Sequence, residues 1–296
     1  MNIMVALLLI CGLASQSLAK PISGESSSVL KPGKYELKKK LIYTISEKIW
    51  NEDEEKQDYV FPTPIKEGFE ASEFEIKLEI YRGMMENLEV GVVLPFLFLK
   101  EIPYLNAAKK SGHGKEDIEL KAKYNFTTNT INTPAISGLL AIKLPTGKEA
   151  KKGCTDLPTS SGGTDLTFMG ILSKNLDPFT GYLNIVYSIT GKGKNEEGNE
   201  INPGNIFSYN LTFDYSLSKR ATFVTELTGK FKSEDKNSNK KKLARTKSSL
   251  TTLLLGIQYE SAKLHHVTLE TALAIRLIGK NEKTGITSIL GSRYEF

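Results

Sequence analysis

The stretch Asn205–Lys232, NIFSYNLTFDYSLSKRATFVTELTGKFK, decides the fold. In its first half, apolar side chains stand on every second position, namely Phe207, Tyr209, Leu211, Phe213, Tyr215 and Leu217. After the break Ser218–Arg220 the alternation resumes, with Glu226 and Lys230 on the polar face. This period of two predicts two amphipathic strands that form an antiparallel hairpin. Each strand has about eleven to thirteen residues, enough for the roughly nine to eleven that a tilted membrane-crossing strand needs.

The N-terminus has the features of a cleaved signal peptide. Ile3–Leu13 is a short apolar core, and Ser17–Ala19 places small residues where a signal peptidase cuts. We expect residues 1–19 to be the signal peptide, 20–34 a short N-terminal periplasmic segment, and 35–296 the folded domain. The alternative for the first residues is a buried N-terminal strand.

The composition excludes several classes of protein. Without the signal peptide the chain keeps one cysteine, Cys154, so a disulfide-stapled secreted scaffold is excluded. Export without disulfides leaves the periplasm or outer membrane of a Gram-negative-type cell. The formal charge of +5 is modest and both signs are scattered, which does not favour nucleic-acid binding. The longest later apolar run, Val90–Leu99, is too short for a transmembrane helix, whereas alternating strands need no such run.

Strand patterns recur along the whole chain after the signal peptide. They cover Tyr35–Ile49, Glu73–Arg82, Leu88–Leu99, Asp117–Phe126, Ala135–Leu144, Thr164–Lys174, Phe179–Thr190, Phe207–Leu217, Ala221–Lys232, Ser248–Glu260, Val267–Ile278 and Gly285–Phe296. The connections alternate long and short nearly to the end, as in outer-membrane barrels with short periplasmic turns. We predict an all-β fold: a single antiparallel transmembrane β-barrel of about twelve strands, with both termini periplasmic. A soluble β-sandwich or lipocalin-like fold gives no reason for this alternation.

Aromatic residues support a membrane-spanning barrel. One predicted band, near the periplasmic ends, contains Tyr124, Phe126, Phe179, Tyr215, Phe223, Tyr259, Tyr294 and Phe296. The second band, near the outer ends, contains Phe96, Phe98, Tyr187, Phe207, Tyr209 and Phe231. Two such girdles are typical of the two membrane interfaces, although aromatics are also good strand residues. The last strand ends in Tyr294 and Phe296, which we interpret as the signal read by the barrel-assembly machinery.

The inward strand faces carry the candidate functional residues. Those that we expect to line the lumen are Glu75, Lys77, Glu79, Glu89, Glu119, Lys121, Lys123, Lys143, Asp165, Asp214, Glu226, Lys230, Glu270, Arg276 and Arg293. Counting from the turns places Glu119 opposite Lys143 and Glu270 opposite Arg293, and brings Glu79 towards Glu89. These charges form either a mutually neutralising ladder without selectivity, or a narrow pore that excludes ions and passes uncharged solutes.

An enzyme is the rival class, because twelve-stranded outer-membrane phospholipases exist. Such chemistry needs a serine and a histidine within hydrogen-bond reach. The three histidines are His113, in a predicted outer loop, and His265–His266, in a predicted periplasmic turn. We therefore expect no enzyme activity, no metal site and no cofactor.

The order of features resembles a known family, the outer-membrane proteins of the meta-pathway of phenol degradation. The resemblance rests on Leu94-Pro95, on Gly114 and Asp117, on Lys143-Leu-Pro-Thr-Gly147, on Gly162-Gly-Thr-Asp165, and on Leu183-Asn-Ile-Val-Tyr187. It covers about Glu73–Lys232, and its most recognisable piece is Pro-Thr-Gly after a strand. The resemblance implies an outer-membrane barrel that passes small hydrophobic or aromatic compounds.

Two functions remain open from the sequence. The first is a channel for passive uptake of small hydrophobic or aromatic, poorly charged solutes. The second is a non-conducting structural or surface-interaction barrel that acts through its long extracellular loops. The expected partners are outer-membrane lipid and lipopolysaccharide, the barrel-assembly machinery and a small-molecule solute, but not nucleic acid. The Lys-rich loop 233–247 is either a solvated tip or a contact for anionic lipid head groups.

Overall fold

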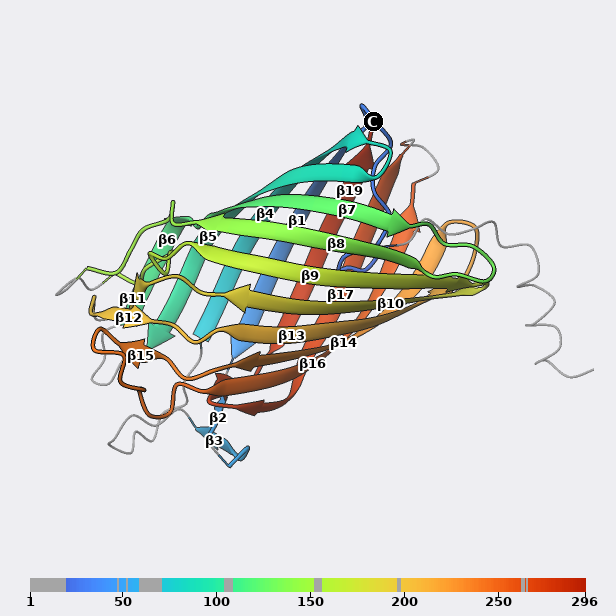
Figure 1. Cartoon of the computed structure of the whole chain (residues 1–296). Helices are drawn as coiled ribbons and strands as arrows, with labels where there is room; N and C mark the ends of the chain where they lie inside the picture. The colour runs from blue at the N-terminus through green and yellow to red at the C-terminus, as the bar shows by residue number, and fades with distance from the viewer. Residues whose placement is uncertain are drawn as a thin grey trace, which may run out of the picture.

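A computed structural model describes residues 20–46, 48–51, 53–58, 71–103, 109–151, 156–195, 198–261, 264 and 266–296. Across these residues, twelve long strands form one closed antiparallel barrel (Figure 1). They are β1 Tyr35–Ser46, β4 Ala71–Met85, β5 Leu88–Pro103, β7 Ile118–Thr127, β8 Ala135–Leu144, β9 Asp165–Leu176, β10 Phe179–Ile189, β13 Ile206–Ser216, β14 Ala221–Lys232, β16 Ser248–Glu260, β17 Val267–Lys280 and β19 Ile286–Glu295. Each pairs with its neighbour in the chain, and β1 pairs with β19 to close the ring. The predicted fold is confirmed.

The hairpin β13–β14 shows how the alternating sequence builds the wall. Its register pairs Phe207 with Phe231 and Tyr215 with Phe223, so these side chains share one face. Phe213 on that face is 53% exposed, whereas the next side chain along, Thr212, is fully buried. Because the side chains of a strand point alternately to its two faces, the apolar face looks outward and the polar face into the barrel.

Large apolar side chains cover the outside of the barrel. Exposed examples occur on almost every barrel strand, among them Leu120, Ile136, Leu140, Phe168, Leu172, Ile185, Leu255, Leu273 and Leu290. Aromatic pairs stand near the strand ends, such as Tyr124–Phe126 and Tyr294–Phe296, with ring centroids 5.1 and 5.2 Å apart. Such a continuous apolar band is the surface that a bilayer covers. Among the described residues, no helix has the length and apolarity to cross a membrane.

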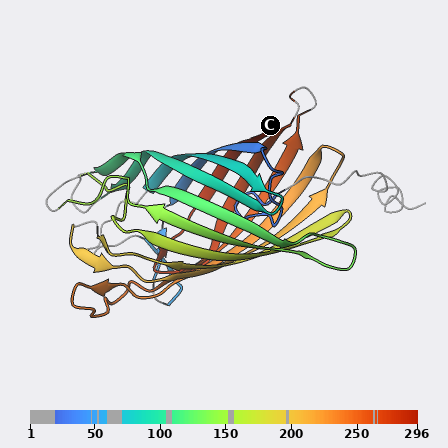
Figure 2. The same ribbon diagram turned by 45° about the horizontal axis from the view of Figure 1, so that its top comes forward.

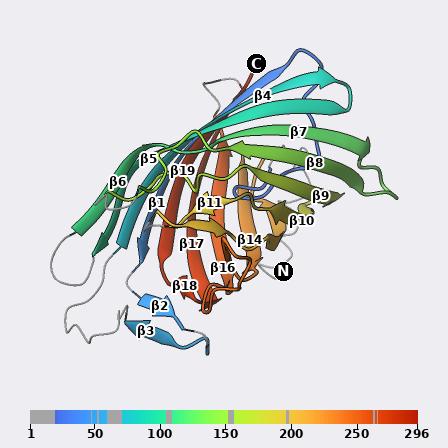
Figure 3. The same ribbon diagram turned by 60° about the vertical axis from the view of Figure 1, so that its left-hand side comes forward.

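The two ends of the barrel differ. Short turns join β4 to β5, β9 to β10 and β13 to β14 at the short-turn end, where the C-terminus also lies (Figures 1 and 2). The opposite, long-loop end carries β6 Lys109–Lys115, which pairs with β5, and two small sheets (Figure 3). The sheets consist of β2 Lys48–Trp50, β3 Lys56–Asp58 and β18 Glu282–Lys283, and of β11 Gly193–Lys194, β12 Glu200–Asn202 and β15 Lys236–Asn237. The sequence predicts only polar loops there.

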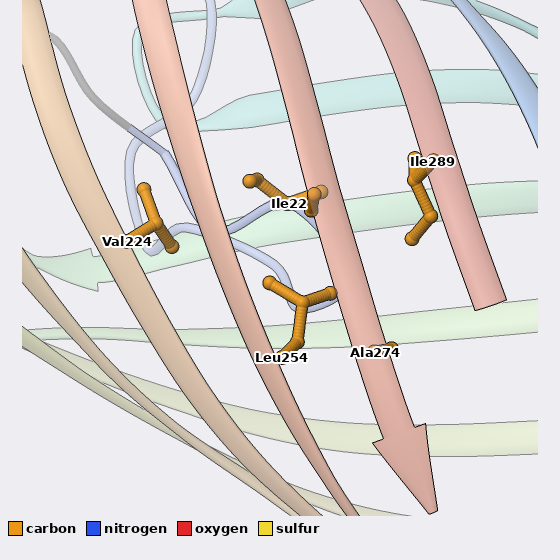
Figure 4. Close-up of a cluster of buried hydrophobic side chains, with 6 residues drawn as sticks. Ile22, Val224, Leu254, Ala274 and Ile289 are labelled. Carbon is orange, nitrogen blue, oxygen red and sulfur yellow. The ribbon is translucent and has the colours of Figure 1, made fainter. Parts of the chain in front are cut away.

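We call residues 20–34 the internal segment; residues 20–30 run inside the barrel, and residues 31–34 are exposed at its short-turn end. Ile22 is 1% exposed and packs against inward side chains of β14, β16, β17 and β19 (Figure 4). The segment then returns to the short-turn end, where the Tyr35 amide donates to the carbonyl of Phe296. The sequence predicts a periplasmic segment, with nothing to indicate that it enters the lumen. Its small polar residues suit that place because they hydrogen-bond to the polar inner wall.

Candidate functional site: the barrel lumen

Six of the predicted lumen residues line two cavities inside the barrel. Near the long-loop end, Glu75, Lys77, Glu119 and Lys143 line a cavity of about 660 Å³, the long-loop cavity. Glu79 and Lys121 line a smaller cavity of about 200 Å³, the middle cavity, which shares Lys77, Val93 and Glu119 with the first. Other candidates are buried side chains of the barrel strands, namely Glu89, Lys123, Asp214, Glu226, Glu270 and Arg293.

Three candidates lie towards the long-loop ends of their strands. Asp165 forms an ion pair with Lys143 at 2.6 Å. Lys230 lies 4.0 Å from Glu282 of β18, and the guanidinium of Arg276 donates to the carbonyl of Lys283 at 3.1 Å. The first contact joins β8 to β9, whereas the other two tie the barrel wall to β18, so the three residues form no shared site.

Opposite charges pair along the inner wall. Lys40 lies 3.5 Å from Glu79, Lys123 lies 3.0 Å from Glu89, and Lys77 lies 3.2 Å from Glu75. Lys143 contacts both Asp165 and Asp117. Because both partners of these pairs belong to the barrel or its loops, they neutralise the wall without any bound ion. Cross-strand pairs such as Lys40–Glu79 and Lys123–Glu89 contribute about 0.2–1 kcal/mol each.

The strand registers test three pairings expected from the sequence. Glu119 pairs with Lys143 across β7 and β8, as predicted. Glu270 faces Gly291, and Arg293 faces Thr268, so that predicted pair is wrong by two residues. The pairing of β17 with β19 was counted outward from an assumed turn between them. The connection contains β18, so the centre of the turn lies at a different residue.

Glu79 and Glu89 do not face each other, which contradicts the sequence prediction. Glu79 pairs with Val93 and Glu89 with Gly83. Their carboxylates have separate lysine partners, so no repulsive carboxylate pair forms between them.

The first half of the internal segment is held by β14 and β16. The carboxylate of Glu226, which is fully buried, accepts from the amides of Ile22 at 2.5 Å and Ser23 at 3.1 Å, and from the Ser23 hydroxyl. The side chain of Gln258 donates to the carbonyl of Lys20 at 2.6 Å. A buried carboxylate must find such donors, because leaving it without hydrogen bonds is costly.

The second half crosses to the opposite wall. Asn184 on β10 accepts from the amide of Glu25 at 2.7 Å and donates to its carbonyl at 2.9 Å. The carboxylate of Glu25 pairs with Lys121 on β7 at 3.0 Å. Ser137 on β8 donates to the carbonyl of Ser27, and Glu89 on β5 accepts from the amide of Leu30 at 2.9 Å. The segment thus bonds to strands on several sides of the lumen.

The internal segment lies between two sets of cavities. Ile22–Glu25 line the middle cavity, whereas Ser26–Val29 line a cavity of about 350 Å³ at the short-turn end. That short-turn cavity is mostly lined by hydroxyl and amide side chains, including Asn125, Ser173 and Thr180. The middle and short-turn cavities share no lining residue among the residues that the structure describes. The internal segment thus separates these two cavities where it crosses the lumen.

Several residues that face the lumen were not predicted from the sequence. Glu36, Lys38 and Lys40 of β1 point inward. Their spacing of two residues indicates a polar inner face, but the outward Lys39 between them makes the alternation hard to recognise in the sequence. Glu116, just before β7, also lines the long-loop cavity. Burial and the neighbouring carboxylate of Glu75 raise the pKa of Glu116 to about 7. Glu25 carried no periodic signal.

The histidines and possible metal ligands form no shared centre among the described residues. His113 belongs to β6 at the long-loop end, His266 lines a small cavity of about 90 Å³ at the short-turn end, and His265 lies outside the described residues. No group of three or more His, Cys, Asp or Glu side chains in the described ranges could hold a metal ion.

The closed wall and its polar lumen define a twelve-stranded β-barrel of the outer-membrane type. Within that class, the chain belongs to the family described as "Putative MetA-pathway of phenol degradation", whose model matches residues 81–281. The resemblance stated from the sequence is confirmed.

Solved structures show the same architecture. The COG4313 outer membrane channel from Pseudomonas putida F1 is 12% identical with a TM-score of 0.78, covering 94% of this chain and 100% of that chain. The translocator domain of the autotransporter NalP from Neisseria meningitidis is 12% identical with a TM-score of 0.55, covering 90% of each chain. The NanC porin is 10% identical with a TM-score of 0.51, covering 86% of this chain and 98% of that chain. These likenesses concern the fold alone. No curated protein sequence matches the chain.

Proposed function

We propose that this protein is a passive outer-membrane channel for small, poorly charged solutes, in particular hydrophobic or aromatic compounds. The observation that supports this proposal best is a closed barrel with three cavities along its interior. From the long-loop end to the short-turn end they measure about 660, 200 and 350 Å³. In the proposed orientation the short turns are periplasmic and the long loops extracellular, as in other barrels of this type.

The pairing of wall charges supports the solute class. A carboxylate that is already paired with a lysine, as in Glu79–Lys40, attracts a mobile ion only weakly. Uncharged compounds need no counter-charge and cross such a lumen at lower cost. The family description, which refers to phenol degradation, agrees with an aromatic cargo.

The test is solute flux through proteoliposomes, with and without the internal segment. A variant lacking residues 21–30 should pass benzyl alcohol and small sugars faster than the full mature chain, because the cavities then merge. Folding of both proteins is checked by heat-dependent mobility in detergent gels. Absence of flux in the folded variant for every compound tried would reject the channel.

A non-conducting barrel is the second candidate. The observation that favours it is the internal segment itself, bonded to β14, β10 and β7 across the lumen. Such a barrel would act through the small sheets at its long-loop end. In that case the deletion variant would fold yet remain closed to solutes.

We also propose that the protein is not an enzyme. In support, two of the three similar solved structures reported above are described as a channel and a porin. Lipid or peptide turnover that is lost in a His113→Ala variant would overturn this proposal.

A further inference from the structure

Lys121 differs from the other paired lysines of the wall in the origin of its partner. Its nearest carboxylate, Glu25 at 3.0 Å, belongs to the internal segment, while Glu119 of its own strand is 4.0 Å away. By contrast, Lys40 and Lys123 pair with Glu79 and Glu89, which are part of the barrel strands. Displacement of the segment therefore leaves Lys121 without its nearest counter-charge.

The middle cavity lies directly beside this pair. Four lysines bring ammonium groups to its lining, and three carboxylates lie among them: the lysines are Lys38, Lys40, Lys77 and Lys121, and the carboxylates are Glu25, Glu79 and Glu119. Its other lining includes the apolar side chains of Ile42, Val93 and Ile289. The cavity measures about 200 Å³, and an apolar cavity of about 150 Å³ suffices for a benzene ring. The lining thus has one more ammonium group than carboxylates, and it offers apolar contacts to the rest of a small molecule.

The shared residues Lys77, Val93 and Glu119 connect this cavity to the long-loop cavity. A solute that enters from the long-loop end therefore reaches Lys121 and residues 22–25 together, before it reaches residues 26–29 of the internal segment. Ile22–Glu25 form the boundary on the far side.

We propose that the middle cavity binds a small monocarboxylate with an apolar body, which takes the place of Glu25 at Lys121 and so loosens the internal segment. This inference rests on the proposed channel function, since it names a ligand that opens the path. The exchange keeps the Lys121 ammonium group paired, because one carboxylate replaces another there, while the displaced Glu25 carboxylate moves away with the loosened segment. A neutral molecule of the same shape cannot do this.

The competition between Glu25 and the ligand for Lys121 determines the ligand concentration that is needed. Glu25 is tethered, so its effective concentration at Lys121 is of the order of millimolar, and the ligand must act in a similar range. The bonds of Glu226 to Ile22 and Ser23 stay intact during this exchange. The loosening should therefore begin at residues 24–30 and not at residues 20–23.

Hydrogen exchange of the internal segment tests the proposal without requiring conduction. The probe is benzoate, with benzamide as its neutral counterpart at equal ionic strength. Benzoate should accelerate exchange of the amides of residues 24–30 in a saturable manner, while benzamide should leave it unchanged. A Lys121→Met variant should lose the response. Lys148→Met, which removes an exposed lysine paired with Asp156 at 2.6 Å, should retain it.

Binding affinity supplies a second test that a merely structural role of Glu25 would not pass. In Glu25→Gln the tethered competitor is gone, so benzoate should bind at least about tenfold more tightly than to the unmodified chain. Calorimetric titration of the detergent-solubilised protein measures this. Equal or weaker binding in Glu25→Gln would overturn the proposal.

The two proposals fail in different ways. If the variant lacking residues 21–30 conducts but benzoate neither binds nor accelerates exchange, the ligand site is wrong and the channel stands. If benzoate binds with the expected competition but the deletion variant passes no solute, the channel is wrong and the site stands.

Discussion

At the scale of single residues, Glu226 makes the most concentrated set of bonds to the internal segment. Its carboxylate accepts from two backbone amides and a hydroxyl of that segment, and also from Asn210 on β13. In Glu226→Gln an amide group replaces one acceptor oxygen and faces donors. We expect a loss of about 1–3 kcal/mol in stability and faster hydrogen exchange at Ile22 and Ser23. Urea unfolding and exchange measure the two effects.

The control for that substitution is Glu234→Gln. Glu234 pairs with Lys242 at 2.6 Å, and both side chains are exposed, so its loss should change stability very little. Equal effects of the two substitutions would show that Glu226 does not anchor the segment.

Glu116 gives a pH dependence at the same scale. Its pKa in the folded protein is about 7, above its ordinary value of 4.5, because of burial and the nearby Glu75 carboxylate. Between these two values the folded state binds more protons than the unfolded state, so this group lowers stability as pH rises from 4.5 to 7. Glu116→Gln should flatten the dependence of the unfolding midpoint on pH over that interval. An unchanged slope would contradict the assignment.

At the scale of elements, the strands could be predicted and the internal segment could not. Alternation along β13 and β14 is a local property, because each side chain's face follows from its position in the strand. The segment 20–34 has no such period, and its partners Asn184 and Glu226 lie 159 and 204 residues further on from Glu25 and Ile22. The Glu270–Arg293 pairing failed for a related reason, since register depends on where a turn is centred.

The last strand carries an element-scale prediction. The ring of Phe296 stacks on Tyr35 and Tyr294, with centroids 5.6 and 5.2 Å away, at the point where β19 meets β1. Phe296→Ala removes both contacts at the closing seam and also the expected assembly signal. We expect less folded protein in outer-membrane fractions. Phe231→Ala, which removes an outward ring from the other end, should lower the yield less. Equal yields for both variants would argue against a special role of the seam.

At the scale of the whole molecule, a barrel of this kind functions as a channel only if its internal segment can leave the wall. Ser27 and Ser173 offer a direct test, because their hydroxyls hydrogen-bond to each other where the internal segment meets β9. Ser27→Cys with Ser173→Cys, in a chain where Cys154 is serine, should form a disulfide that ties the segment to β9. We expect low solute flux when oxidised and recovery with dithiothreitol, because conduction requires the segment to move. Each single-cysteine chain should be insensitive to the reductant. Full flux in the oxidised double variant would contradict this expectation. It would mean that solutes cross the barrel while the internal segment remains bound to β9.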